Sequence, residues 1–165
     1  MQTKQMMEEF YSTPDPWGYK NHEEDEKRRN KIIETAKKYR PKYRRALDLG
    51  CGEGFITEKL PARHIYGYDL SETAMSRLPE NVKKSDPIEG MYDLIIATGV
   101  MYIEYDYQQM LDTIKSHAKG IVILSNIKNL QVQAVEQLGA PIYEEEYPYR
   151  EYTQSLKVYD FSRKQ

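Results

Sequence analysis

The chain alternates short apolar runs with stretches of helical apolar spacing over most of its length. Buried strands are predicted by four near-continuous apolar runs, "RALDL", "HIYGYDL", "YDLIIAT" and "IVILSNI", and a weaker strand by "VKKSD". Helices are predicted between them by "GEGFITEKL", by "SETAMSRL", which Ser71 would cap, and by "YQQMLDTIKSHA", which would end near Gly120. Apolar strands separated by helices are typical of a parallel sheet covered on both faces, so the pattern predicts an α/β fold.

The residues before this alternation are predicted to form an arm and one long helix. Residues 1–21 hold a short amphipathic piece and then "TPDPWGYKN", whose prolines and glycine break regular structure, so we interpret them as an ordered arm or lid. Residues 22–40 are predicted to form a helix, with Asn21 as its cap, Glu24 three residues later and Pro41 as its end. One buried face of this helix is predicted by apolar residues at helical spacing, Ile32, Ile33, Ala36 and Tyr39.

Residues 126–165 differ in pattern from the middle of the chain. "NLQVQAVEQLG" predicts a helix, and "PIYEEEYPY" and "TQSLKVYDF" predict a terminal pair of strands. With 165 residues, of which 39% are hydrophobic and 30% are charged, the chain suits a single domain spanning 1–165 with one core.

Composition argues against several classes of protein. No apolar run approaches the about 18 residues that a membrane helix needs, and the N-terminus lacks a secretory core, so we expect a cytoplasmic protein without a membrane partner. The single cysteine, Cys51, allows no internal disulfide, and no CxxC or HExxH spacing occurs, so no metal site is expected. The formal net charge of −2 argues weakly against a dedicated nucleic-acid-binding protein.

The segment "DLGCGEG" carries glycines at alternate positions, Gly50, Gly52 and Gly54, between a predicted strand and a predicted helix. Glycine allows a tight turn and a close approach of the backbone to a ligand, and a helix N-terminus offers free N–H groups. A fingerprint for NAD would instead have the spacing GxGxxG. Asp69 ends the next strand, where it would accept hydrogen bonds from both hydroxyls of a free ribose. These features predict a nucleoside cofactor, and a structural glycine turn with a capping aspartate is the alternative.

Together, "LDLGCGEG", "YDLS" and "YDLIIATGVMYI" resemble the first, second and fourth motifs of the class I S-adenosylmethionine-dependent methyltransferases, over a cofactor-binding core at residues 44–125. The resemblance implies S-adenosyl-L-methionine as cofactor and a Rossmann-like methyltransferase fold. This fold has a mostly parallel seven-stranded sheet in the order 3-2-1-4-5-7-6, helices on both faces and an antiparallel last strand. The acidic residue that opens the first motif, here Asp48, orients the cofactor in this family. The residues that match the family's cofactor-binding positions are Asp48, Gly50, Cys51, Gly52, Gly54, Asp69, Leu70 and Asp86.

The adenine contacts implied by the resemblance include one departure from the family's pattern. Leu70 would lie on the adenine face, and Asp86, after the third strand, would contact the adenine amino group. A backbone N–H often contacts the adenine ring at the next position, but this position is Pro87, which has no N–H. The contact would therefore pass to Ser85 or Ile88.

The arm carries a second resemblance. "YSTPDPWGY" is similar to the "DPW" segment of the nodulation protein S type of methyltransferase, a group that methylates an amine on a chitooligosaccharide. The resemblance implies that Trp17 covers the cofactor, and an aromatic face suits a sulfonium cation. Alternatively, Trp17 anchors the arm in the core.

The loop "ATGVMYIEYDY" follows the fourth strand of the family's fold, where groups near the methyl are commonly held. Thr98 would bond the methionine end of the cofactor, while Tyr102 and Glu104 would face the acceptor, with Tyr102 the one candidate catalytic residue. Methyl transfer is an in-line displacement that positioning and desolvation accelerate, so a dedicated acid or base is optional. The histidines are expected to be structural or solvated: His22, His64 and His117.

Basic residues are concentrated in one strip, with ten Lys or Arg against one Glu between Lys27 and Arg45. Such a strip would suit RNA or an anionic substrate, but its apolar spacing favours a packed helix with a solvated basic face. The favoured function is therefore methyl transfer to N or O of a small molecule or sugar. The alternatives are RNA or protein methylation through this strip, a non-catalytic S-adenosylmethionine-binding protein and, less favoured, NAD-dependent reduction. The sequence leaves the oligomeric state open.

Overall fold

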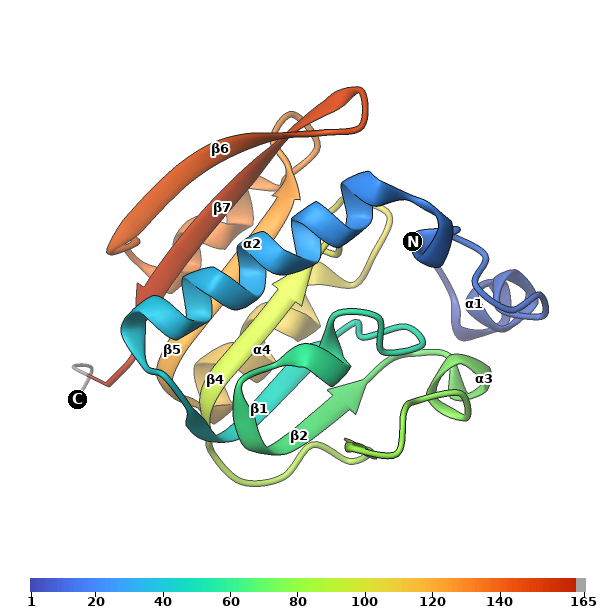
Figure 1. Cartoon of the computed structure of the whole chain (residues 1–165), viewed down its shortest axis with the longest axis horizontal. Coiled ribbons are helices and arrows are strands. Elements are labelled where there is room, and N and C mark those ends of the chain that lie inside the picture. The colour runs from blue at the N-terminus through green and yellow to red at the C-terminus, as the bar shows by residue number, and fades with distance from the viewer. Residues whose placement is uncertain (163–165) are drawn as a thin grey trace.

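The computed structural model describes residues 1–162, which contain a seven-stranded sheet (Figure 1). The strands are β1 (Tyr43–Leu49), β2 (Ala62–Tyr68), β3 (Val82–Lys84), β4 (Tyr92–Thr98), β5 (Ala118–Ile127), β6 (Tyr143–Tyr149) and β7 (Tyr152–Asp160). They lie in the order β3-β2-β1-β4-β5-β7-β6. The pairs among β1 to β5 are parallel, and β7 pairs antiparallel with both β5 and β6. The predicted strand order and the antiparallel last strand are confirmed.

Helices lie on both faces of this sheet. The α-helices are α1 (Lys4–Phe10), α2 (Glu23–Tyr39), α3 (Glu72–Met75) and α4 (Tyr107–His117). Three short 3₁₀ helices accompany them, η1 (Tyr19–Asn21), η2 (Thr57–Lys59) and η3 (Gln133–Leu138). Figure 1 shows α2 crossing in front of the sheet and α4 behind it. None of the helices in residues 1–162 is long and apolar enough to cross a membrane.

The two faces of the sheet explain why the central strands are apolar throughout. Successive side chains of a strand point to opposite faces. In β4, Ile96 belongs to the buried cluster that contains Ile32 of α2, whereas Ile95 belongs to the cluster that contains Leu111 of α4. All four side chains have no exposed surface. Because a helix covers each face of the sheet, side chains that point to either face are buried, and apolar residues occupy both kinds of position.

The start of α2 differs from the prediction. Asn21 ends η1, and His22 takes the N-cap position of α2 without a side-chain hydrogen bond, so the predicted Asn21 cap is wrong. Gly18, with φ at 68°, turns the chain into η1, and its carbonyl accepts a hydrogen bond from the Asn21 backbone N–H. Acidic residues still fill the first turn of α2, where they complement the helix dipole: Glu23, Glu24, Asp25 and Glu26.

Two other predicted helices are reduced to 3₁₀ turns. "GEGFITEKL" forms only η2, because Gly54, with φ at 91°, and Pro61 leave little more than one turn of chain between them. "NLQVQAVEQLG" forms only η3, which stops at Gly139, with φ at 88°. The helix predicted to begin after Ser71 is confirmed as the four-residue α3, with the Ser71 hydroxyl oxygen accepting from the Ala74 N–H at 3.0 Å. The predicted terminal strand pair is present as β6 and β7.

Candidate functional site

A cavity of about 330 Å³ opens beyond the carboxyl ends of β1, β2 and β4. Its walls come from the loops that follow these strands, from the N-terminal arm, from α2 and from the start of α4. In open α/β sheets this edge is where ligands bind, because loops from neighbouring parallel strands meet there. The position of the cavity therefore agrees with the site predicted from the glycine loop.

The glycine loop forms one wall of this cavity. Gly52 adopts φ at 56°, and a Cβ built there would come within 2.8 Å of the Tyr11 hydroxyl. The backbone N–H groups of Gly50 and Cys51 both donate to the Tyr68 carbonyl, at 2.8 and 3.0 Å. The loop is thus held between the end of β2 and the arm, at a distance that only glycine permits.

Asp69 lies at the end of β2 and is 6% exposed. One carboxylate oxygen accepts from the Gly52 N–H at 2.8 Å, and the other accepts from the Ser71 N–H at 2.9 Å. Burial raises the pKa of Asp69, and these two backbone donors oppose that effect. Each oxygen of a carboxylate can accept more than one hydrogen bond, so the group retains capacity for two ribose hydroxyls.

Asp48 lies at the floor of the cavity and is 2% exposed. Its Oδ2 accepts from the Thr57 hydroxyl at 2.7 Å, whereas Oδ1 has no hydrogen-bond partner in the described residues. Burial raises the pKa of Asp48 to about 7. A buried acceptor that lacks a donor is costly, so this oxygen is suited to a cationic donor from a ligand.

Arg28 lines the same cavity from α2, and the sequence analysis did not single it out. Its side chain is only 5% exposed, and its guanidinium carbon lies 5.3 Å from the Tyr19 ring centre and 5.2 Å from that of Tyr149. Nε has no hydrogen-bond partner among the described residues. Arg28 precedes Ile32 by one helical turn and so extends the buried face of α2, which is the sequence signal that would have found it.

Aromatic side chains of the arm, together with Tyr105 from the loop between β4 and α4, form another wall of the cavity. The Trp17 Nε1–H donates to the Tyr11 hydroxyl at 3.2 Å, and the rings of Trp17 and Tyr19 stack with centres 6.3 Å apart. Burial raises the pKa of Tyr11 above its usual range and that of Tyr105 to about 12. These tyrosines therefore stay protonated at neutral pH and act as polar aromatic surfaces.

The arm is fastened to the glycine loop and to α3. Arg77 donates to the Tyr11 carbonyl and to Glu53, both at 2.8 Å, and Glu53 in turn accepts from the Asp15 N–H at 2.9 Å. Glu8 accepts hydrogen bonds from the Ser71 hydroxyl and the Thr73 N–H. These contacts hold the arm beside the cavity.

The structure brings most, but not all, of the predicted site residues together. Eight of them line the cavity: Trp17, Asp48, Gly50, Cys51, Gly52, Asp69, Leu70 and Thr98. Four do not: Gly54, Ser85, Asp86 and Tyr102. Gly54 packs against Pro79, and the buried Ser85 hydroxyl lies 3.3 Å from that of Tyr92. The Tyr102 hydroxyl accepts from the Ile127 N–H at 2.8 Å, so it supports the loop after β5.

The cysteine and the histidines offer no evident nucleophile or base at the cavity. Burial holds the pKa of Cys51 well above its usual value, so its thiol stays protonated. Neither His22, His64 nor His117 lines the cavity. The described residues contain no cluster of three or more His, Cys, Asp or Glu that would hold a metal ion.

Comparison with known proteins identifies a family at the level of sequence. A family model described as "Methyltransferase domain" matches residues 21–160. The ribosomal protein L11 methyltransferase of Thermotoga neapolitana is 28% identical over 116 residues, which cover 61% of this chain and 44% of that protein. The malonyl-[acyl-carrier protein] O-methyltransferase of Bacillus cereus is 32% identical over 98 residues, covering 49% of this chain and 36% of that protein. The chain thus spans less than half the length of these two relatives.

Comparison with solved structures identifies the fold. The N-methyltransferase NodS from Bradyrhizobium japonicum, in complex with S-adenosyl-L-homocysteine, superposes with a TM-score of 0.79. The two chains are 16% identical, and the match covers 97% of this chain and 98% of that one. The predicted Rossmann-like fold is therefore confirmed.

Proposed function

The chain belongs to a family of S-adenosylmethionine-dependent methyltransferases, and we propose that it transfers the methyl group of this cofactor to N or O of a small molecule. The observation that carries the proposal is that two buried side chains of opposite charge, the Asp48 carboxylate and the Arg28 guanidinium, both line the cavity, and each has one atom without a hydrogen-bond partner among the described residues. The amino-acid end of S-adenosylmethionine is a zwitterion. An ammonium donor fits the free Oδ1 of Asp48, and a carboxylate fits the Arg28 guanidinium.

The remaining cavity residues suit the nucleoside part of the cofactor. Asp69 would accept from the ribose hydroxyls, and Leu70, which is 39% exposed beside it, would lie on the adenine. Thr98 would hold the methionine end at the tip of β4. Trp17 would cover the cofactor, since it lines the cavity and its Nε1–H donates to the Tyr11 hydroxyl.

The cofactor supplies a methyl group on a positively charged sulfur, and the protein has to position the acceptor and exclude water. The aromatic wall does both, because its rings exclude water and stay uncharged at neutral pH. Tyr105 lines the cavity whereas Tyr102 does not, so we propose Tyr105 as the acceptor-facing tyrosine in place of Tyr102. An acceptor atom that already carries a free lone pair would need no base.

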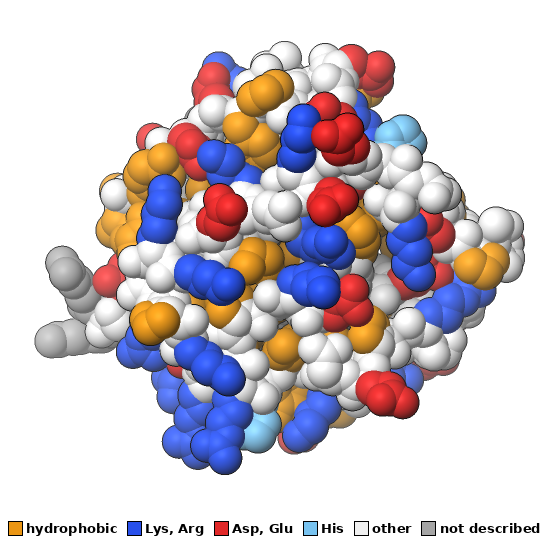
Figure 2. Space-filling model, in the orientation of Figure 1, with side chains coloured by type: hydrophobic (Ala, Val, Ile, Leu, Met, Phe, Trp, Pro, Cys, Tyr) orange, Lys and Arg blue, Asp and Glu red, His pale blue; other side chains and the backbone are white. Residues whose placement is uncertain are grey.

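A small acceptor is favoured by the size of the cavity and by the ion pairs that basic residues of the 27–45 strip form with acidic residues. Lys27, Lys31 and Arg40 each form an ion pair with an acid, and Arg28 is buried. Figure 2 shows Lys and Arg interspersed with Asp and Glu over the α2 face, apart from a denser basic group at the lower left. The second candidate, RNA or protein methylation, draws support from this basic group and from the ribosomal protein L11 methyltransferase relative.

Thermal unfolding with added ligands tests the cofactor assignment. S-adenosylmethionine and S-adenosylhomocysteine at millimolar concentration are expected to raise the melting temperature, and NAD is not, because only a ligand that binds the folded state stabilises it. An equal shift with NAD would refute the assignment.

Transfer of labelled methyl groups into separate pools of small metabolites, RNA and protein then tests the acceptor. Label in RNA alone would reverse the proposed order, and label in none of the pools would favour a non-catalytic binding protein.

A further inference from the structure

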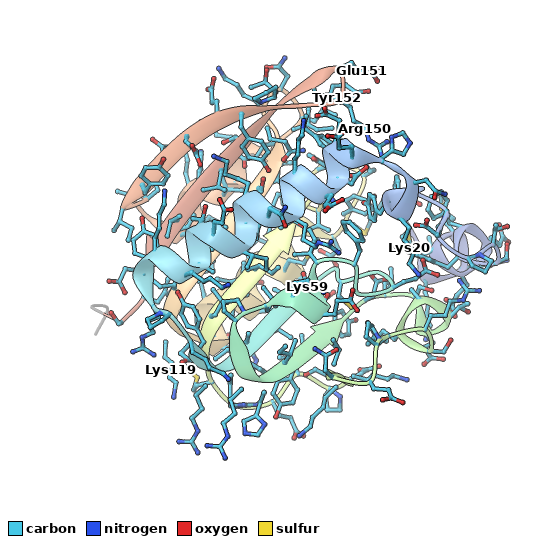
Figure 3. All side chains as sticks on the ribbon, in the orientation of Figure 1. Lys20, Lys59, Lys119, Arg150, Glu151 and Tyr152 are labelled. Atoms are coloured by element: carbon cyan, nitrogen blue, oxygen red, sulfur yellow. The ribbon has the colours of Figure 1, made fainter. Side chains whose placement is uncertain are left out.

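Asp25 links three elements of the protein through one buried carboxylate. It lies in the first turn of α2 and has no exposed surface. The Tyr149 hydroxyl donates to Oδ1 at 2.5 Å, and Arg150 Nη2 donates to Oδ2 at 2.5 Å. Figure 3 shows Arg150 at the turn between β6 and β7, beside the start of α2. Arg150 Nη2 also lies 3.4 Å from the Trp17 carbonyl, which ties the arm to the same group.

Asp25 also faces the cation at the floor of the cavity. Arg28 Nε lies 3.8 Å from Asp25 Oδ1, one helical turn further along α2. The ring faces of Tyr19 and Tyr149 also flank the guanidinium. Ring faces attract a cation but leave its rotation about the side-chain bonds free, whereas a carboxylate opposite Nε favours one orientation.

We propose that Asp25 is a positioning residue, which holds the Arg28 guanidinium in the orientation that receives the carboxylate of the cofactor. The inference rests on the proposed function, because it needs Arg28 to bind that carboxylate. A buried arginine without a counter-charge is costly, and Asp25 supplies that counter-charge to Arg28 at 3.8 Å. The hydroxyl of Tyr149 and the guanidinium of Arg150 complete the hydrogen bonding of Asp25 and hold it in place.

The test compares two ligands that differ only in the group that Arg28 would bind. S-adenosylhomocysteine carries both ammonium and carboxylate, and decarboxylated S-adenosylhomocysteine keeps the ammonium alone. In the Asp25→Asn variant, the dissociation constant for S-adenosylhomocysteine is expected to rise about tenfold, while that for the decarboxylated ligand changes less than about twofold. Isothermal titration calorimetry measures both constants.

Matched variants separate positioning from general damage. Glu26→Gln neutralises an exposed acid in the same helical turn and is expected to leave both constants unchanged. Arg28→Gln is expected to show the same ligand selectivity as Asp25→Asn, and the double variant should weaken binding no further than Arg28→Gln alone. If Asp25→Asn does not fold, Tyr149→Phe, which removes one donor to Asp25, is expected to show the same selectivity to a smaller degree.

Three results would overturn the inference. Equal losses for both ligands in Asp25→Asn or Tyr149→Phe would show that Asp25 only supports the fold. A loss in Arg28→Gln with none in the Asp25 variant would show that Arg28 needs no positioning, and the proposed function would stand. Failure of the unmodified protein to bind S-adenosylhomocysteine would instead remove the proposed function itself.

Discussion

Two buried aspartates at opposite ends of the same sheet differ in how completely they are bonded. Asp93, at the amino end of β4, is 5% exposed and accepts three hydrogen bonds, from the backbone N–H groups of Arg44 and Arg45 and from the Arg40 guanidinium. Asp48, at the carboxyl end of β1, is 2% exposed and leaves Oδ1 without a donor. The first carboxylate closes a structural junction, and we propose that the second accepts a hydrogen bond from a ligand.

The difference follows from the direction of the strands. At the amino end, neighbouring segments of the chain pack directly on one another, so the donors to Asp93 come from within the protein. At the carboxyl end, the glycine loop and the arm leave a cavity of about 330 Å³. A buried polar group without a partner is rare in folded proteins, and here it coincides with the edge of the sheet where ligands bind.

The largest expected effect is on stability, at the amino end. Asp93→Ala would leave the Arg44 and Arg45 N–H groups without an acceptor and is expected to lower the free energy of unfolding by about 3 kcal/mol. Urea denaturation measures this change. If Asp93 has no role in the cavity, the fraction that folds should bind S-adenosylhomocysteine normally. A loss of stability below ~0.5 kcal/mol would contradict the structural role of Asp93.

The next effect is on binding, at the carboxyl end. Asp69→Ala is expected to weaken S-adenosylhomocysteine binding by about 1 to 3 kcal/mol, because the hydrogen bonds to the ribose hydroxyls are lost. Calorimetric titration measures the change, and Asp112→Ala, an exposed acid on α4, is the control. An unchanged dissociation constant would place the ribose elsewhere.

The raised pKa of Asp48 predicts that the free energy of unfolding depends on pH. Its pKa is raised from 3.8 to about 7 in the folded protein without ligand, so its neutral form is favoured by folding. The corresponding stabilisation is fully present below pH 3.8 and is lost as the pH rises through about 7. Asp48→Asn is expected to flatten this part of the curve of unfolding free energy against pH. A bound ammonium would favour the charged form, so added S-adenosylhomocysteine should also flatten it in the unmodified protein. Identical curves for Asp48→Asn and the unmodified protein would contradict the raised pKa.

The smallest effect is expected at the exposed basic residues of the amino end. Arg44 and Arg63 are exposed, and their positive charges, after burial and Lys83, contribute to lowering the pKa of His64. Replacing both with Ala should change the free energy of unfolding by less than ~0.5 kcal/mol and leave cofactor affinity intact. A selective loss of methyl transfer to RNA in this double variant would favour the RNA-directed alternative.

The site was predictable where its residues are close in sequence or recur at a fixed spacing. Gly50, Gly52 and Asp69 belong to one strand–loop–strand unit, so their convergence follows from local pattern alone. Arg28 and Tyr11 were missed because their roles depend on where α2 and the arm pack. Ser85 and Tyr102 were placed in the site by resemblance. In the structure the Ser85 hydroxyl lies beside that of Tyr92, and the Tyr102 hydroxyl accepts from the Ile127 N–H.

The sequence by itself determined the succession of strands and the position of the glycine loop, because apolar periodicity and glycine spacing are local properties, and the resemblance of its motifs to a known family indicated the cofactor. Only the tertiary structure decided which charges are buried together. Tyr149 at the end of β6 and Asp25 in α2 are 124 positions apart in the sequence, yet their side chains form a hydrogen bond. Whether a charged residue is solvated or held at a cavity floor depends on such distant neighbours, since burial and hydrogen-bond partners are properties of the folded chain as a whole.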